Sequence, residues 1–599
     1  MIIEQQVADR PERSDVNQSK PKQGKHLSKQ IKQIRIMHTS DVHGALFTHD
    51  FIENGPAKGS LAKVYALVKK ERERQGNNLI LLDGGDVLQG QPTAYYYNFV
   101  VPERPHLVAR AMNLMGYDAM CIGNHDLETG HGVYDRFCKE CNFPILGANV
   151  LDENSGAPYF TPYVMIEREG VRVAVLGLLT AAIPHWLPKN LWSGMSVENM
   201  LESARKWSEY ILNVEKPDLL IGLFHSGWDG GVQTDKYTEN MVRLIASQVP
   251  GFDIICFGHD HDKRIEVIRP DWGGKVVCVG LWSQAASVSM IDVQLEFEQD
   301  KLVRKRTRAQ VVSTLYVQDD SVFDFERHFQ DDSVAVEHFV NRRIGAFSNT
   351  VYGQDAFFGS SALIDFVHQL QLDISGADLS FAAPSFFDMV IHAGDVYVRD
   401  MFSLYKYENM LYVLRMKGHE IKAILEMSYR LWTNRMTNED DHLLLIDNLL
   451  NGGKGYGFVN LTFNFDSAAG IRYQVDVRRP DGEKVLIGCM ADGSVFDLER
   501  EYLVATNSYR ANGGGELFTI GAGLTHEELM DRIVWCSERD LRYYFMEYVE
   551  RHERVSLKPM NHWCFIPEDW VAKATQRDRE LLFGWKRLHE ADRGSKNID

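Results

Sequence analysis

The sequence predicts an α/β protein built from two domains. Its 599 residues exceed what one hydrophobic core usually organises. Strand-like and helix-like segments alternate over residues 34–318, which is typical of a layered α/β domain. A charged, helix-like segment within residues 319–349 then precedes a second patterned region at 350–575. We therefore expect two domains joined by a linker helix.

Strand-like apolar runs recur through the first domain, and helix-like segments lie between several of them. The runs are Ile34–His38, Leu79–Asp83, Ala119–Ile122, Val171–Leu179, Asp218–Phe224, Asp253–Phe257, Val276–Gly280 and Val288–Leu295. Leu61–Arg74 predicts an amphipathic helix, because apolar residues such as Val64 and Val68 share one face with charged residues opposite.

The second region has a different pattern. Val322–Ile344 predicts the linker helix, since it is charged, has Phe and Val at helical spacing, and lacks Gly and Pro. Beyond it we expect a helix at Ser361–Leu372 and hairpin-like strands around Asn460–Val477. Helical, aromatic-rich segments follow, at Leu541–Arg551 and then around Trp563 and Trp570.

Composition excludes several classes of function. The net charge is −18, from 65 basic and 83 acidic residues, which argues against binding a nucleic-acid polymer. No apolar run reaches membrane-spanning length; the longest, Val173–Ile183, is interrupted by Gly177. We expect no membrane partner, and the oligomeric state stays open.

The eight cysteines show no framework spacing, so we interpret them as buried thiols in a reducing compartment. The pair Cys138 and Cys141 forms a lone CxxC with no second pair to complete a zinc site. Both chain ends are polar. Residues 1–33 lack an apolar signal core and predict a disordered tail, and residues 576–599 predict a frayed polar tail.

Potential metal ligands follow five of the apolar runs. They are Asp41 and His43, Asp86, Asn124 with His125, His225, and His259 with His261. In extended backbone, residues two apart point to the same side, so the two pairs Asp41/His43 and His259/His261 can each converge. Carboxylate, imidazole and amide groups suit Mn, Zn, Fe or Co. The pattern predicts a dinuclear metal site.

These residues carry a resemblance to a known family. Asp41-Val-His43, Gly85-Asp86, Gly123-Asn-His125, His225 and Gly258-His-Asp-His261 resemble, in order, the motif set of the calcineurin-like metallophosphoesterases. The linker helix and the second domain look like the 5′-nucleotidase family in particular. The resemblance runs from Ile34 to about Trp570. It implies a layered αββα metallophosphoesterase domain at 34–318 and an α+β nucleotidase substrate domain at 350–575.

The resemblance also implies a ligand set for two divalent ions, with Asp86 as the shared ligand. One ion would take Asp41, His43, Asp86 and His261; the other would take Asp86, Asn124, His225 and His259. A metal-bound hydroxide would attack the phosphoryl group, so no side chain has to act as the nucleophile. The implied class is a metal-dependent phosphoric ester hydrolase of nucleotide catabolism.

His125 remains for the leaving oxygen or the phosphoryl charge. The family usually reads Gly-Asn-His-Glu-aromatic-Asp, whose last residue orients the histidine. Here Glu128 takes that position and Asp126 takes the Glu position. The expected catalytic dyad is His125–Glu128, with Asp126 as the rival partner.

The second domain bears on which phosphate is cleaved. In the 5′-nucleotidase branch, this domain begins with a segment resembling Asn-Gly-Gly-x-Arg, whose arginine binds phosphate. Here the corresponding segment, Gly376–Pro384, has no arginine, and the next one is Arg399. Tyr405–Asn409 and Ala505–Gly515 resemble the branch that hydrolyses 2′,3′-cyclic nucleotides and then 3′-nucleotides. The alternatives are a 5′-nucleotidase or nucleotide-sugar pyrophosphatase and, more remotely, a degenerate nucleotide-binding or adhesion protein.

By position in the family, Phe465 and Tyr509 are expected to stack on the nucleobase. The other interpretation of Phe465 is a core residue. Arg510 is a candidate to replace the missing phosphate-binding arginine, and the backbone of Gly513 and Gly514 is a candidate ligand contact. Related enzymes are typically exported, but no leader is recognisable. We expect a cytoplasmic enzyme, or a periplasmic or exported one if a leader has been removed.

Overall fold

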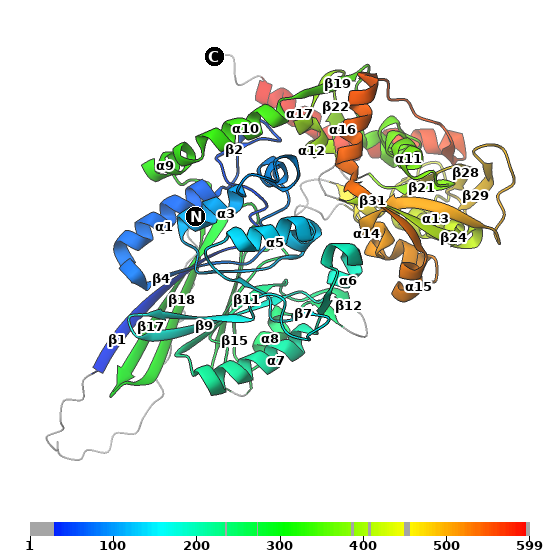
Figure 1. The fold of residues 1–599 in the computed structure, drawn as a ribbon. Coiled ribbons are helices and arrows are strands. Elements are labelled where there is room, and N and C mark those ends of the chain that lie inside the picture. Colours follow the sequence, from blue (N-terminus) through cyan, green and yellow to red (C-terminus); the bar gives the residue numbers. More distant parts are fainter. Residues whose placement is uncertain are drawn as a thin grey trace. The chain divides into compact units, whose positions relative to one another are not determined.

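The computed structural model describes residues 29–233, 237–271, 273–384, 389–404, 409–447 and 456–594 (Figure 1). The chain divides after Val340 into two units, each with its own core. The residues expected to form the N-terminal tail up to residue 28 lie outside the described residues, whereas residues 29–33 belong to the first strand. No helix among the described residues is both long and apolar enough to cross a membrane.

Two six-stranded sheets form the centre of the first unit. The first has the order β18 (Lys301–Ser313), β17 (Ser287–Glu298), β1 (Lys29–Thr39), β4 (Leu79–Asp83), β5 (Ala119–Cys121) and β6 (Ile145–Leu146). The second has the order β15 (Arg264–Ile268), β16 (Val276–Gly280), β14 (Ile254–Phe257), β11 (Leu219–His225), β9 (Val171–Leu179) and β8 (Tyr163–Arg168). Strands β1, β4, β5 and β6 are parallel, as are β9, β11, β14 and β16.

Both faces of these strands are buried. Ile36 of β1 and Leu82 of β4 belong to the core between the sheets, together with Val173 of β9. The alternate residues Met37 and Leu81 belong to a second core with helices α1 (Leu61–Gln75), α3 (Leu107–Met115) and α5 (His131–Glu140). Helices α7 (Met200–Tyr210) and α8 (Val242–Gln248) pack on the other sheet. This confirms the predicted αββα layering, and it explains why the strands are continuous apolar runs.

The segment predicted as one linker helix forms two helices, α9 (Asp320–His328) and α10 (Gln330–Val340). The helical hydrogen bonds end at Phe329, where the backbone leaves the helical region. Phe325, Phe329 and Val336 are buried in the first unit's core. The prediction of a single helix to Ile344 was therefore wrong: these helices pack on the first unit, and strand β19 begins at Arg343.

The second unit is an α+β structure. Its main sheet has the order β27 (Ser467–Ala469), β21 (Leu379–Ala382), β30 (Glu501–Asn507), β24 (Met410–Lys417) and β31 (Ile533–Asp540). Helices α11 (Ala362–Ser375), α13 (Gly418–Trp432) and α16 (Leu541–His552) contact it. A smaller sheet has the order β29 (Val485–Met490), β28 (Ile471–Asp476) and β33 (Trp563–Ile566), and another joins β23 (Gly394–Tyr397), β19 (Arg343–Phe347) and β32 (Arg554–Val555).

Two expectations for the end of the chain were wrong. Trp563 lies in strand β33, not in a helix. The residues expected to fray from 576 onward continue helix α17 (Glu568–Gly594) as far as Gly594. Asp578 ties this helix to the unit, because its buried carboxylate accepts the backbone N–H groups of Leu443 and Leu444.

Candidate metal centre

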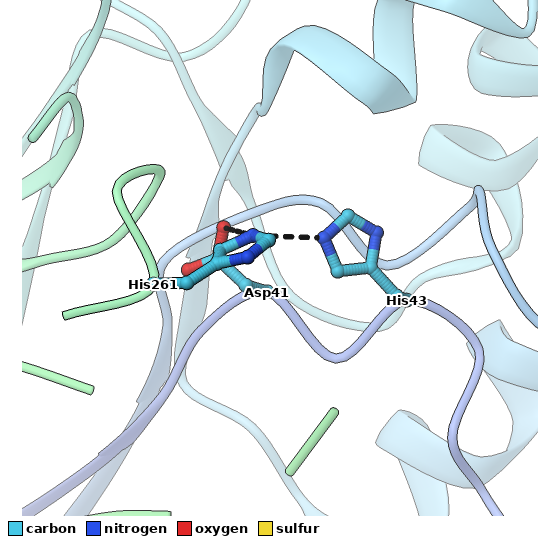
Figure 2. A group of neighbouring side chains, drawn as sticks. All are labelled: Asp41, His43 and His261. Atoms are coloured by element: carbon cyan, nitrogen blue, oxygen red, sulfur yellow. Dashed lines mark hydrogen bonds and ion pairs between the residues drawn. The ribbon is translucent and has the colours of Figure 1, made fainter. Parts of the chain in front are cut away.

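Two loops of the first unit bring three potential ligands together. Asp41 and His43 follow β1, and His261 follows β14. The Nε2 atoms of His43 and His261 are 3.2 Å apart, and Nε2 of His261 is 3.4 Å from Oδ1 of Asp41 (Figure 2). These side chains could hold one metal ion.

A second group of potential ligands surrounds His225 at the end of β11. Its Nε2 atom is 3.1 Å from Oδ2 of Asp86 and 3.0 Å from Oδ1 of Asn124. His259 approaches the same Asn124 oxygen with its Nδ1 atom at 2.9 Å. Ligand atoms of Asp41, Asp86 and His225 lie within 4.8 Å of one another, so the two groups adjoin.

Five of these residues have left-handed backbone conformations. The φ angles are 52° at Asp41, 49° at His43, 60° at Asp86, 83° at His259 and 54° at His261. Each such residue costs on the order of 1–3 kcal/mol and persists only where the surroundings enforce it. Loop-to-loop hydrogen bonds do so here: the N–H of Asp41 bonds to Gly85 O at 2.9 Å, and the N–H of His43 bonds to Asp86 O at 2.8 Å.

Glycines beside the ligands allow this close packing. A Cβ atom on Gly123 would lie 2.1 Å from Oδ1 of Asp86, and one on Gly258 would lie 1.8 Å from Oγ of Ser40. A side chain at either position would displace a neighbouring ligand loop. Strained backbone and obligatory glycines in one place are typical of a functional site rather than of a loop alone.

The donor set fits divalent metal ions. Asp41, Asp86 and His225 are almost fully buried. Burial alone would raise the pKa of Asp86, but the neighbouring His225 and His125 hold it well below its usual range. Buried carboxylates beside imidazole nitrogens provide anionic and lone-pair donors. An O/N set of this kind suits Mn, Zn, Co or Fe.

Next to this centre, His125 and Glu128 form a close pair. Nδ1 of His125 is 2.6 Å from Oε2 of Glu128. Burial lowers the pKa of His125, but the carboxylates of Asp86 and Glu128 outweigh it and raise that pKa to about 9. The metal-free imidazole is therefore protonated at neutral pH.

Asp126 has a different set of partners. Its carboxylate accepts the backbone N–H groups of Asp86, Val87, Leu88 and Gly123 at 2.8–3.0 Å. It is fully buried and holds the loop that carries Asp86. Of the two acidic residues left open by the sequence, Glu128 is thus the one hydrogen-bonded to His125.

We expect Glu128→Gln to lower kcat by on the order of 10²-fold, because His125, the expected general acid, would lose its charged orienting partner. Asp126→Asn should instead reduce thermal stability, since an amide can accept fewer of the four backbone N–H groups. Steady-state kinetics and thermal unfolding of both variants check this. A larger loss of kcat in Asp126→Asn, with unchanged stability, would reverse the two roles.

Comparison with known proteins agrees with this geometry. The calcineurin-like phosphoesterase model matches residues 34–263, and the 5′-nucleotidase C-terminal domain model matches residues 343–521. The two domains occur in this order on one chain. The chain therefore combines a calcineurin-like phosphoesterase domain with a 5′-nucleotidase C-terminal domain, which is the two-domain architecture of the 5′-nucleotidases. It is accordingly a metal-dependent phosphoric ester hydrolase.

Individual relatives are distant but extensive. The chain is 26% identical to a 2′,3′-cyclic-nucleotide 2′-phosphodiesterase/3′-nucleotidase of Yersinia enterocolitica, over 88% of this chain and 87% of that protein. It is 26% identical to the trifunctional nucleotide phosphoesterase protein YfkN of Bacillus subtilis over 89% of this chain, but spans only 39% of that protein. A solved Staphylococcus aureus structure assigned to the 5′-nucleotidases has a TM-score of 0.71 at 21% identity, covering 89% of this chain and 100% of that one, which shows a shared fold.

In the family's C-terminal domain, the structure corrects the expectation for Phe465. This ring is fully buried and stacks on Trp432 at 5.5 Å with an interplanar angle of 5°. The expected strand around it contains a short 3₁₀ helix, Thr462–Asn464, so Phe463 and Phe465 do not share a face. A buried, stacked ring has no face for a nucleobase. Phe463 is 40% exposed and contacts the Tyr509 ring edge to face at 5.9 Å.

Arg510 is also placed differently from the expectation. Its guanidinium is 2% exposed and forms two hydrogen bonds with Asp466, at 2.6 and 3.3 Å. Further bonds reach the carbonyl oxygens of Phe463 and Gly514, each at 2.5 Å. These contacts occupy its donors, so Arg510 cannot replace a phosphate-binding arginine. It instead holds the Phe463 loop.

The glycines after Arg510 serve this packing. The N–H of Gly513 bonds to Arg510 O at 3.0 Å, so it is not open to a ligand. A Cβ on Gly514 would lie 2.5 Å from the Tyr509 ring. The N–H of Gly513 is thus bonded within the chain, and Gly514 permits the close approach of the Tyr509 ring. Residues 405–408, part of the segment resembling the cyclic-nucleotide branch, lie outside the described residues.

Proposed function

We propose that this enzyme hydrolyses 2′,3′-cyclic nucleotides to 3′-nucleotides, and these to nucleosides and phosphate. The observation that carries the choice is the sequence Gly376–Pro384, where the 5′-nucleotidase branch would place its phosphate-binding arginine and this chain has none. Arg510 offers no substitute, because its donors are held by Asp466, Phe463 and Gly514. An arginine binds phosphate through two hydrogen bonds of fixed geometry, so its loss would alter how the phosphate is held. This favours a substrate whose phosphate occupies a different position.

The residues of the metal centre would divide as follows. Asp41, His43, Asp86 and His261 would hold one ion, and Asp86, Asn124, His225 and His259 the other. When bound, the ions would polarise the phosphoryl oxygens and make water nucleophilic at neutral pH. His125, with Nδ1 bonded to Glu128, keeps its Nε2–H for the leaving oxygen. The ligand set suits Mn, Zn, Co or Fe.

Nucleoside recognition would come from an aromatic pair, the exposed Phe463 and the half-buried Tyr509. We expect Phe463→Ala to raise KM for nucleotides about 10-fold, since stacking on a base is worth roughly 1–3 kcal/mol. Its KM for p-nitrophenyl phosphate should change little, because that ester carries no base. Leu461→Ala, at a neighbouring residue that is 62% exposed, is the matched control. Equal changes for both substrates in Phe463→Ala would remove this ring from the base site.

The test of the substrate class is a side-by-side assay of 2′,3′-cyclic AMP, 3′-AMP and 5′-AMP with Mn²⁺, Co²⁺, Zn²⁺ and Mg²⁺ added in turn. We expect the first two to be hydrolysed fastest. The second candidate, a 5′-nucleotidase or nucleotide-sugar pyrophosphatase, is favoured by the match to the 5′-nucleotidase C-terminal domain. Faster hydrolysis of 5′-AMP would select it, and no hydrolysis with any metal would point to a binding protein.

A further inference from the structure

The ligand histidines differ in what holds their other ring nitrogen. Nδ1 of His43 faces the carbonyl oxygen of Gln89 at 3.0 Å, and Nδ1 of His225 faces that of Gly84 at 2.8 Å. For His259 the partner is a carboxylate: its Nε2 is 2.9 Å from Oε1 of Glu239. Two of these three supports are neutral and one is charged.

Glu239 lies in the segment that connects β11 to α8, and its side chain reaches His259. Strands β12 (Gly230–Gln233) and β13 (Thr238–Asn240) pair there. The backbone oxygen of Glu239 accepts the hydroxyls of Thr180 and Ser226, both at 2.9 Å. The strand bearing Glu239 is thus bonded to the ends of β9 and β11.

The carboxylate itself is held on both oxygens. While Oε1 faces His259, Oε2 accepts the N–H of Val232 at 2.7 Å. Gly231 has a φ of +74°, and a Cβ on it would lie 2.4 Å from Oε2. The side chain of Glu239 is 16% exposed. The connecting segment therefore holds this carboxylate in one orientation, with Oε1 directed toward the imidazole.

We propose that Glu239 is a positioning residue that sets the tautomer of His259 and strengthens it as a metal ligand. A carboxylate only accepts hydrogen bonds, so it favours the ring form with the proton on Nε2. The lone pair is then on Nδ1, the atom that faces Asn124 at 2.9 Å. The negative charge also makes the ring a better donor to a cation. The inference rests on the proposed dinuclear metal centre.

The first test measures binding of Mn²⁺ alone to the full-length protein, by metal titration with electron paramagnetic resonance. Wild type should bind two ions. Glu239→Gln and Glu239→Ala should weaken one site by about 10–100-fold and leave the other unchanged. Glu209→Gln, on an exposed helical residue, is the matched control and should bind as wild type does.

The second test determines the tautomer of His259 in the metal-free protein by ¹⁵N-histidine spectroscopy, at a pH high enough for the imidazole to be neutral. The His259 resonance is assigned by its loss in His259→Gln. We expect the Nε2–H form in wild type and a shift toward Nδ1–H in Glu239→Ala.

The outcomes separate the two proposals. Two wild-type Mn²⁺ sites and an unchanged tautomer in both Glu239 variants would overturn the role of Glu239. Equal weakening of both Mn²⁺ sites with a lower melting temperature would also overturn this role, because Glu239 would then only stabilise the segment that connects β11 to α8. If wild type binds no pair of Mn²⁺ ions, the metal centre fails, and the tautomer measurement still decides on Glu239.

Discussion

Replacing Asp86 with alanine should lower kcat by about 10³-fold or more, equivalent to at least ~4 kcal/mol of transition-state stabilisation. Asp86 is 1% exposed, and its two oxygens have different partners. Oδ2 is 3.1 Å from Nε2 of His225, and Oδ1 accepts the N–H of His125 at 2.8 Å. The variant would lose the proposed shared ligand of both ions and leave His225 without the carboxylate beside its Nε2 atom.

Metal content and phosphatase activity of the purified variant measure this effect. Asp86→Asn is the folding control within the site, because its amide oxygen can still accept the N–H of His125. Asp331→Ala, on an exposed residue of α10, controls for loss of a carboxylate elsewhere and should keep both metals and full activity. An Asp86→Ala enzyme with two tightly bound ions and normal kcat is incompatible with a bridging role.

Replacing Arg510 with alanine should destabilise the second unit by roughly 3–5 kcal/mol, because it leaves the carboxylate of Asp466 buried without a counter-ion. Asp466 is 2% exposed, and burial raises its pKa while the charge of Arg510 opposes that rise. The carbonyl oxygens of Phe463 and Gly514 would lose their donors as well. The Phe463 loop should then lose its fixed position.

Denaturant unfolding of the full chain, followed by tryptophan fluorescence, measures this loss. Arg430→Ala, an exposed residue of α13, is the matched control and should change little. The pair Arg510→Met with Asp466→Leu should recover much of the stability, since both charges are removed together. Unchanged stability in Arg510→Ala, with a raised KM for nucleotides alone, would return Arg510 to the substrate site.

Much of the first unit could be predicted from local pattern. Strands buried on both faces are continuous apolar runs, and parallel strands place their ends at one edge, so a layered α/β domain and the grouping of potential ligands followed from the pattern, while the αββα layers were implied by the family resemblance. The backbone geometry that brings Asp41 and His43 together differs from the one that the sequence pattern predicted. Extended alternation was predicted for both, but both have positive φ angles.

The second unit shows where local pattern stops being informative. Phe463 and Phe465 are two residues apart and chemically identical, yet one is 40% exposed and the other is buried against Trp432. A short 3₁₀ helix, Thr462–Asn464, contains Phe463 and ends before Phe465, so the two rings occupy different faces. Likewise, Arg510 beside Tyr509 suggested a ligand contact, and only its bonds to Asp466 and Phe463 reveal a clamp.

By itself, the sequence determined where the main strands of the first domain lie along the chain, the class of fold and the residue types at five strand ends, because these depend on residues close together in the chain. The tertiary structure decided which acidic residue is hydrogen-bonded to His125, which phenylalanine is exposed, and that Glu239 lies 2.9 Å from His259. Those choices depend on contacts such as the one from residue 239 to residue 259, for which no local periodicity exists. Burial and hydrogen-bond partners are properties of the packed chain, and they determine the chemistry of each side chain.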